Sequence, residues 1–453
     1  FIVRGEVFVT SADYATTKQI THTAAREAGI AFAPDNRTLA YASERNGNWQ
    51  LILAKIARKE DPNFPNATII NEEVLLPSAT VERTYPQFSP DGKELAFIED
   101  RNRLMVLNLE TKKVRQITDG STWYSTGGGF DYSWSPDGKW FTLEFTGNKH
   151  DPYSDIGLVS ADGKGEIVNL TNSGYMSGSP RFVLDGNAIL FITERYGMRA
   201  HASWGSQNDV MLVFLNQDAY DKYRLSKEDY ELRKELEKEQ KKAQKKDDDG
   251  KDKKDNKKDN KKEDDDAEAK VKDIVVELKN IEDRIVRLTP NSSDLGSAII
   301  SKDGETLYYF AAFEGGYDLW KMDLRKKDTK LLHKMDAGWA YMELDKEGKS
   351  LFLLGSSDMK KMDMASNDLN PITYRANVKM DLAAEREYMF DHVYKQQQKR
   401  FYNTNMHGVD WDAMSAAYRK FLPHINNNYD FAELLSEWLG ELNVSHTGGR
   451  YYP

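Results

Sequence analysis

The chain has 453 residues, 30% of them charged, and a formal net charge of −10. This length allows about two to four domains with a large core, and the negative charge gives no electrostatic footprint for binding nucleic acid. The absence of cysteine excludes disulfides, zinc–thiolate sites and a thiol nucleophile. No run of 18 or more apolar residues occurs, so the sequence predicts no membrane-spanning helix.

The first residues, Phe1-Ile2-Val3-Arg4-Gly5, contain neither an initiator methionine nor a signal peptide. We therefore expect that position 1 is not the natural start of the protein, and that any export signal would lie outside this sequence.

A short turn pattern recurs along most of the chain. An apolar residue, a small residue and Pro-Asp-Gly precede an apolar strand at residues 88–92 and again at 134–138. Proline presets φ, aspartate binds its own backbone and glycine accepts a positive φ, so the pattern joins two strands tightly. Relatives of the pattern stand at residues 32–36, 184–186, 301–304 and 345–348.

The spacing of these turns predicts the architecture. Successive turn acids are 44 to 56 residues apart, apart from one gap of 118 residues. Each copy is followed by a further strand that ends in Ile-Thr or Leu-Thr, as at residues 117–118, 170–171 and 288–289. Periods of about 40 to 50 residues with several short strands are typical of propeller blades. Six turns thus predict six blades, one of them enlarged.

The two ends of this region supply a seventh blade. Residues 4–9 and 18–21 have the pattern of the last strands of a blade, and residues 374–380 can pair with them. Closure of the ring would remove the exposed sheet edges. We therefore expect a mainly β fold, a seven-bladed β-propeller of the WD40-like or TolB-like kind over residues 1–380. A six-bladed ring, with the N-terminal strands in another domain, is the alternative.

The enlarged blade is the fourth, and its insertion covers about residues 198–274. Residues 225–240 favour a helix because Glu, Leu, Lys and Arg dominate. Residues 231–270 hold 15 basic and 15 acidic side chains. Such a segment cannot bury enough apolar surface to offset its ordering entropy. We expect a solvated excursion without fixed structure, and a docking arm for a partner is the alternative.

The pattern changes after residue 380, where three helices are predicted. Residues 381–399 place apolar side chains near one face, and residues 410–419 form a second helix with Asp410 as N-cap. Residues 431–442 form a third helix with Asp430 as N-cap. Helices that follow an all-β ring indicate a new domain over residues 381–453.

His446 is the candidate catalytic residue. It follows Ser445 in a polar stretch after the third helix, and the glycines behind it allow other backbone to come close. The pKa of imidazole suits general-base catalysis near neutral pH. A Ser-His pair alone would still be explained best by chance, because any protein of 453 residues can contain such a pair. The other histidines show neither an i, i+4 pair nor His-Glu-x-x-His, so we expect no metal site and no cofactor.

The order of motifs near the C-terminus resembles the start of the catalytic core in tricorn-type serine peptidases. The motifs are residues 405–411, Tyr418-Arg419 and residues 440–446. The opening at residues 4–8 and the Pro-Asp-Gly blades resemble the second, seven-bladed propeller of that family. The resemblance covers the chain apart from the charged insertion. The blade motifs also occur in TolB-like propellers, whereas Gly-Val-Asp-Trp followed by Leu-Asn-Val-Ser-His is much more specific.

The resemblance implies that His446 is the general base for a serine nucleophile and that Ser445 helps to orient its imidazole. In the family, the nucleophile, a glutamate and the oxyanion-hole amides lie downstream, past a PDZ-like domain. We therefore expect part of a serine protease that degrades oligopeptides, with the propeller gating or channelling peptide, and we expect this chain to be inactive alone. The resemblance further implies a homo-oligomer in the cytoplasm. A periplasmic or exported protein is the alternative, because the natural N-terminus is not visible.

Two other hypotheses stay open at this point. One is a non-catalytic TolB-like propeller that scaffolds a protein complex, although such a module has no need of the helical residues 381–453. The other is a gating propeller for a hydrolase of the prolyl-oligopeptidase type. That class would carry a Gly-x-Ser-x-Gly elbow, and no such elbow occurs in this sequence.

Overall fold

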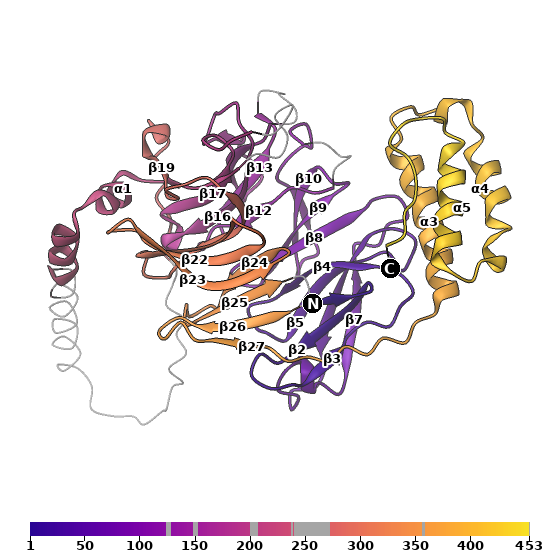
Figure 1. Cartoon of the computed structure of the whole chain (residues 1–453), viewed down its shortest axis with the longest axis horizontal. Helices are drawn as coiled ribbons and strands as arrows, with labels where there is room; N and C mark the ends of the chain where they lie inside the picture. Colours follow the sequence, from indigo (N-terminus) through magenta and orange to yellow (C-terminus); the bar gives the residue numbers. More distant parts are fainter. Residues whose placement is uncertain are drawn as a thin grey trace. The chain divides into compact units, whose positions relative to one another are not determined.

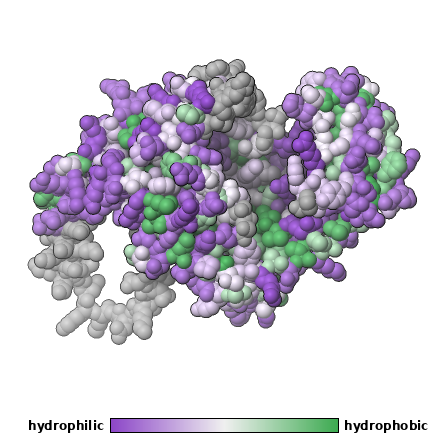
Figure 2. Space-filling model, in the orientation of Figure 1, coloured by the Kyte–Doolittle hydropathy of each residue, from purple (hydrophilic) through white to green (hydrophobic). Residues whose placement is uncertain are grey.

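The computed structural model describes residues 1–123, 128–147, 153–199, 207–236, 239, 272–355 and 358–452. The chain forms two compact units (Figure 1), the first made of residues 1–130 and 372–453 and the second of residues 131–371. The visible surface of the described residues is mostly hydrophilic, with scattered apolar side chains (Figure 2). None of the described helices is long and apolar enough to cross a membrane.

The first unit contains three antiparallel sheets. A three-stranded sheet holds β1 (Ile2–Val3), β2 (Glu6–Thr10) and β3 (Thr17–Gln19). A four-stranded sheet holds β4 (Glu27–Phe32), β5 (Thr38–Ser43), β6 (Gln50–Ile56) and β7 (Ile70–Leu75). The next holds β8 (Arg83–Phe88), β9 (Glu94–Glu99), β10 (Arg103–Asn108) and β11 (Val114–Gln116).

The second unit contains four antiparallel sheets of four strands each. The first two hold β12 (Tyr132–Trp134), β13 (Trp140–Phe145), β14 (Asp155–Ser160) and β15 (Val168–Asn169), then β16 (Ser177–Val183), β17 (Ala188–Thr193), β18 (Asp209–Phe214) and β19 (Ile285–Arg287). The others hold β20 (Asp294–Ile300), β21 (Thr306–Ala312), β22 (Tyr317–Asp323) and β23 (Asp328–Ala337), then β24 (Ala340–Leu344), β25 (Ser350–Gly355), β26 (Met359–Asp363) and β27 (Leu369–Pro371). The described residues thus form seven successive sheets, which confirms the predicted seven-bladed β-propeller.

Apolar side chains of neighbouring blades pack between the sheets. One cluster joins β5, β6 and β7 of one blade with β9 and β10 of the next; its buried members are Ala40, Leu51, Leu53, Leu75, Leu95, Phe97 and Leu107. Strands buried on both faces explain why the blade strands read as nearly continuous apolar runs.

The Pro-Asp-Gly turns join the first and second strands of their blades as predicted. In the turn between β8 and β9, the Ser89 hydroxyl donates to Asp91 at 2.7 Å and accepts from the amide of Glu94 at 3.0 Å. Gly92 has a φ of +70°, which favours glycine. Ser135 with Asp137, and Ser301 with Asp303, repeat the serine–aspartate bond in two other blades.

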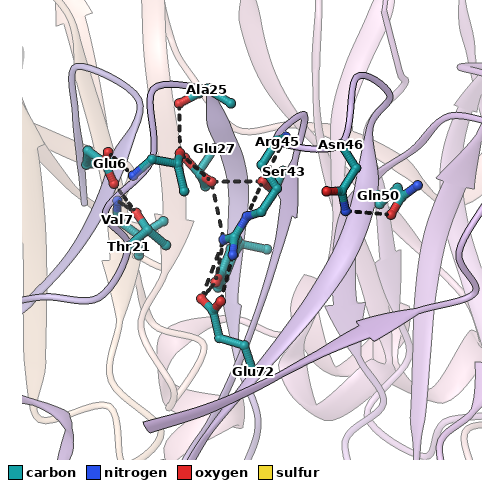
Figure 3. A network of polar contacts seen from close by, with 12 residues as sticks. Glu6, Val7, Thr21, Ala25, Glu27, Ser43, Arg45, Asn46, Gln50 and Glu72 are labelled. Carbon is teal, nitrogen blue, oxygen red and sulfur yellow. Dashed lines mark hydrogen bonds and ion pairs between the residues drawn. The ribbon is translucent and has the colours of Figure 1, made fainter. Parts of the chain in front are cut away.

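The recurring Ile-Thr and Leu-Thr pairs have a bonding role. In four blades the threonine hydroxyl accepts from an amide of the next-to-last strand; the pairs are Thr21 with Val7, Thr118 with Leu104, Thr171 with Ile156 and Thr289 with Val210. In three of them the same hydroxyl donates to a buried carboxylate, namely Glu6, Asp155 or Asp209. Figure 3 shows Thr21 between Glu6 and the backbone of Val7.

The N-terminal blade differs from the prediction at residues 374–380, which were expected to pair with its last strands. Residues 374–380 do not form the expected strand, so this sheet keeps three strands. The ring of Tyr374 lies 4.7 Å from that of Phe1, and the amide of Arg375 donates to the side chain of Thr17 at 3.4 Å. Because the amide bonds a side-chain hydroxyl rather than a backbone carbonyl, the segment follows the blade without joining its ladder.

The long connection in the fourth predicted blade runs from β18 to β19. Strand β18 falls inside the range 198–274 assigned to the insertion, so the insertion begins after Phe214 and not at residue 198. It opens with α1 (Gln217–Arg224), and residues 227–236 are also helical. Residues 240–271, which hold most of the charged run, lie outside the described residues.

Three helices follow the propeller strands: α3 (Leu382–Arg400), α4 (Trp411–Arg419) and α5 (Asn428–Gly440). They lie side by side in Figure 1. Asp410 caps α4 as predicted, accepting from Ala413 at 2.9 Å. The predicted cap of the third helix is wrong: Asn427 caps α5, and its side chain accepts from the amide of Asp430. Asp430 instead lies in the first turn, where the helix dipole favours its charge.

Short 3-10 turns complete the described elements: η1 (Phe64–Asn66), η3 (Leu184–Gly186), η5 (Ile281–Arg284), η6 (Met406–Gly408) and η7 (Leu422–His424).

Candidate functional site

The Ser-His pair lies on a loop that folds back onto α5. The hydroxyl of Ser436 on α5 donates to the carbonyl oxygen of Gly449 at 2.8 Å and accepts from its amide at 2.9 Å. A Cβ atom at Gly449 would lie 3.1 Å from the carbonyl oxygen of Ala432. The absence of a side chain at Gly449 therefore permits the close approach that was expected of these glycines.

Ser445 and His446 occupy a turn at the exposed part of this loop. His446 has a φ of +66°, a left-handed conformation that is uncommon for a residue with a Cβ atom. The turn is held by the hydroxyl of Thr447, which donates to the carbonyl oxygen of Val444 at 3.0 Å. Within the described part of the chain, neither Ser445 nor His446 makes a side-chain hydrogen bond. The imidazole is therefore accessible to a group that approaches from outside.

His407 supports the start of this loop, a role that the sequence pattern does not predict. Its Nδ1 atom donates to the carbonyl oxygen of Leu442 at 2.8 Å. Its Nε2 atom lies 2.5 Å from the hydroxyl of Tyr402. Since a carbonyl oxygen only accepts, the neutral ring carries its proton on Nδ1 and accepts from Tyr402 at Nε2. This bond connects the Gly-Val-Asp-Trp region with the Leu-Asn-Val-Ser-His region.

A stack of aromatic rings forms the base under the loop. Trp438 is fully buried and stacks between Phe390 at 4.1 Å and Trp411 at 4.6 Å. The indole nitrogen of Trp411 donates to the carbonyl oxygen of Tyr394 at 3.2 Å. One ring from each of the three helices thus holds α5 and the loop behind it in place.

The Tyr418-Arg419 pair connects α4 with its neighbours. The hydroxyl of Tyr418 donates to Glu441 at 2.8 Å, and burial together with this carboxylate raises the pKa of Tyr418 to about 12. Arg419 pairs with Asp391 and Glu387 on α3. These contacts give the motif a structural role next to the loop.

Helix α3 is fastened to the loops of the first unit by a row of polar contacts. The hydroxyl of Tyr388 and Nδ1 of His392 both reach Glu44, at 2.6 Å and 2.7 Å. Burial alone would raise the pKa of Glu44, but the hydrogen bonds from His392 and Tyr388 outweigh it, and the pKa lies below its usual value. Lys395 donates to the carbonyl oxygen of Gly47, and Lys399 donates to Glu82.

Comparisons with known proteins match this region and the propeller. A family model described as the tricorn protease C1 domain matches residues 382–440, the stretch of α3, α4 and α5. Over 376 residues the chain is 24% identical to the "Putative Tricorn-like protease C-terminal subunit" of Sulfurisphaera tokodaii, covering 79% of this chain and 38% of that protein. It is 23% identical over 384 residues to "Tricorn protease homolog 1" of Streptomyces coelicolor, covering 79% and 33%.

The chain is similar to the tricorn-type proteases in both its propeller and its helices. The crystal structure of the tricorn protease matches it with a TM-score of 0.69 at 13% identity, covering 100% of this chain and 41% of that one. At this identity the match shows a shared fold. The chain spans well under half of the length of these relatives. The resemblance to tricorn-type proteases that the sequence predicts is confirmed. The family model ends at residue 440, so the roles of Ser445 and His446 stay predictions.

Among the described residues, no group of three or more His, Cys, Asp or Glu side chains could hold a metal ion.

Proposed function

We propose that this chain is the second propeller and the beginning of the catalytic core of a tricorn-like serine protease that degrades oligopeptides. The observation that carries the proposal is the exposed imidazole of His446, on a loop held against the matched C1 helices by Ser436 and His407. A general base has to be accessible to the hydroxyl that it deprotonates and has to be fixed in place. The propeller acts as the gate or conduit for peptide.

His446 takes the proton from a serine hydroxyl, and the alkoxide attacks the peptide carbonyl to form an acyl-enzyme. The same imidazole then returns the proton to the leaving amine. Ser445 orients the ring once the nucleophile and its surroundings are in position. The nucleophile comes from sequence beyond these residues, so this chain alone binds no acyl group and is inactive. The proposed protein is a cytoplasmic homo-oligomer.

The test uses the natural full-length protein and a fluorogenic peptide substrate. His446→Ala should lower kcat/KM by at least about a thousandfold, because loss of one triad member removes most of the catalysis. His424→Ala is the matched control, because this exposed histidine belongs to the same helical segment but not to the loop that carries His446. Full activity of His446→Ala would contradict the assignment.

A fluorophosphonate probe tests the serine-type chemistry separately. It should label the full-length protein at one serine outside residues 1–453 and should fail to label the His446→Ala variant. Peptide hydrolysis without any labelling would point to another class of protease. The non-catalytic TolB-like module is not favoured, because residues 382–440 match a protease domain model.

A further inference from the structure

Two adjoining cavities lie beneath α3 in the first unit. Their volumes are about 310 Å³ and about 500 Å³. Glu82, Arg101 and Arg400 line both, so the two spaces share a wall. None of the lining residues belongs to the loop that carries His446, and this region is therefore separate from the candidate catalytic site.

Positive charge is concentrated around these cavities. Their linings hold five cationic side chains, Arg26, Arg101, Arg103, Lys399 and Arg400, and two anionic ones, Glu82 and Asp100. Both acids have cationic partners: Asp100 pairs with Arg103 at 2.6 Å and Glu82 with Lys399 at 2.9 Å. A local excess of positive charge in a chain with a net charge of −10 attracts anions to this place.

Arg400 is the last residue of α3, and one of its hydrogen-bond donors is buried without an acceptor. Its Nε atom is buried and makes no hydrogen bond, and the side chain forms no ion pair with any residue that the structure describes. A buried donor without an acceptor destabilises the protein, and an anion in the cavity would satisfy it. The guanidinium presents a planar fork of donors that matches a carboxylate.

Arg101 is presented by a tight hairpin turn between β9 and β10. Asp100 and Arg101 both have positive φ, at 45° and 72°, so non-glycine residues occupy a turn that favours glycine. The Nε atom of Arg101 lies 3.7 Å from Glu82, with which it forms an ion pair across the shared wall of the cavities. Burial lowers the pKa of Arg101, and an additional anion would offset that desolvation.

The smaller cavity also has an aromatic and glycine-rich wall. Trp49 and Tyr85 line it together with the backbone of Gly29 and Gly129. A Cβ atom at Gly129 would lie 2.7 Å from the ring of Tyr85, so the ring rests on bare backbone. The strands β4 and β8 bulge at residues 28–31 and 84–87, which leaves backbone groups outside the ladders. Such a wall suits a short extended chain attached to an anion.

We propose that the joined cavities bind a carboxylate group of a short peptide, with Arg400 as its direct ligand and Arg101 and Arg26 beside it. Bidentate pairing of guanidinium and carboxylate provides the recognition. The aromatic and glycine wall receives the residues next to the carboxylate. The carboxylate is either the peptide C-terminus or an acidic side chain. The proposal concerns binding to the present chain, and its test does not depend on peptide hydrolysis.

Fluorescence anisotropy with three dansylated probes tests the proposal at about 50 mM salt, where screening is modest. The probes are dansyl-tetraalanine with a free C-terminus, the same peptide as its amide, and an amide in which one alanine is replaced by glutamate. At least one carboxylate-bearing probe should bind about tenfold more tightly than the plain amide. The free-acid and glutamate probes distinguish the two sources of the carboxylate.

Arg400→Gln should weaken binding of the preferred probe by about tenfold or more, and Arg400→Lys should restore only part of it. Lys420→Gln is the matched control, because it removes one positive charge from an exposed residue that lines neither cavity. If Arg400→Gln does not fold, Arg26→Gln at the exposed rim provides the second test, with about threefold weaker binding expected.

Equal affinity for the acid and amide probes would overturn the proposal. So would unchanged affinity in both arginine variants, or equal weakening in Lys420→Gln. Inorganic phosphate is the last probe: if it binds to the wild-type protein at Arg400 and no carboxylate peptide does, the site is a phosphate site and the peptide proposal fails.

Discussion

The Nδ1 atom of His407 lies 2.8 Å from the carbonyl oxygen of Leu442. Leu442 is fully buried and begins the segment that leads to Ser445 and His446. The bond spans 35 residues and fixes the start of the loop to the turn before α4. The position of the candidate base therefore depends on a histidine that is not itself a catalytic residue in the proposed mechanism.

His407→Ala should lower the stability of the helical segment by about 1–3 kcal/mol, because a buried carbonyl loses its donor. His407 also has a φ of +57°, which alanine disfavours. His407→Asn separates the two effects, since asparagine tolerates this backbone and keeps a donor. Urea unfolding of the three proteins is the measurement. Equal midpoints for His407→Ala and wild type would show that the bond contributes nothing.

Gly449→Ala should displace the loop from α5. Its Cβ atom would lie 3.1 Å from the carbonyl oxygen of Ala432 and 3.1 Å from Cβ of Leu435. We expect faster amide hydrogen exchange over residues 443–450 with a small change in the unfolding midpoint. Gly440→Ala is the control, because a Cβ atom there meets nothing within 4 Å. Unchanged exchange in Gly449→Ala would mean that the loop does not need this contact.

Thr289→Val should destabilise the second unit by about 2–3 kcal/mol. The substitution keeps the shape of the side chain but removes a bond from the amide of Val210, at 3.2 Å, and a bond to Asp209, at 2.7 Å. The amide of Val210 is buried and loses its acceptor, whereas Asp209 keeps the hydrogen bonds from Arg287 and Ser292. Thr16→Val, at an exposed position, is the control. Thermal unfolding of the two variants is compared, and equal midpoints would show that the threonine of this motif is dispensable.

The repeated features of the fold were predictable because they depend on neighbours in the sequence. The serine, aspartate and glycine of each turn bond within a few residues, as Ser89 and Asp91 do, so the pattern itself contains the structural information. Most strands could be placed for the same reason, apart from β18 and the strand expected at residues 374–380. The cap of α5 was misplaced because Asn427 and Asp430 are both good capping residues, and only the three-dimensional path selects one.

Contacts between distant residues were not predictable in this way. His407 has no local signal for its partner Leu442, and Arg400 looks like any cation at the end of a helix. Strand β18 was assigned to the insertion because the charged run beside it obscured a six-residue apolar strand. The general-base role of His446 came from the family resemblance, and the structure adds its exposure and its supports.

Glu27 makes stability depend on pH. It lies in the polar network of Figure 3, next to Ser43 and Arg45. Burial raises the pKa of Glu27 to about 7 from 4.5, against the hydrogen bond from Ser43 and the charge of Arg45. The folded state therefore holds this proton more tightly than the unfolded state. The stabilisation is fully present below pH 4.5 and is lost as the pH rises to about 7, by about 3 kcal/mol at most.

Glu27→Gln removes this titration. Relative to wild type, the variant should become more stable as the pH rises from 5 to 8, because only the wild-type protein then has to bury a charged carboxylate at this position. Glu144, whose pKa is also raised to about 7 by burial and by Asp131, is present in both proteins and cancels in the difference. Urea midpoints at four pH values give the comparison, with the exposed Glu110→Gln as control. If the difference between Glu27→Gln and wild type is the same at every pH, Glu27 does not titrate in this range.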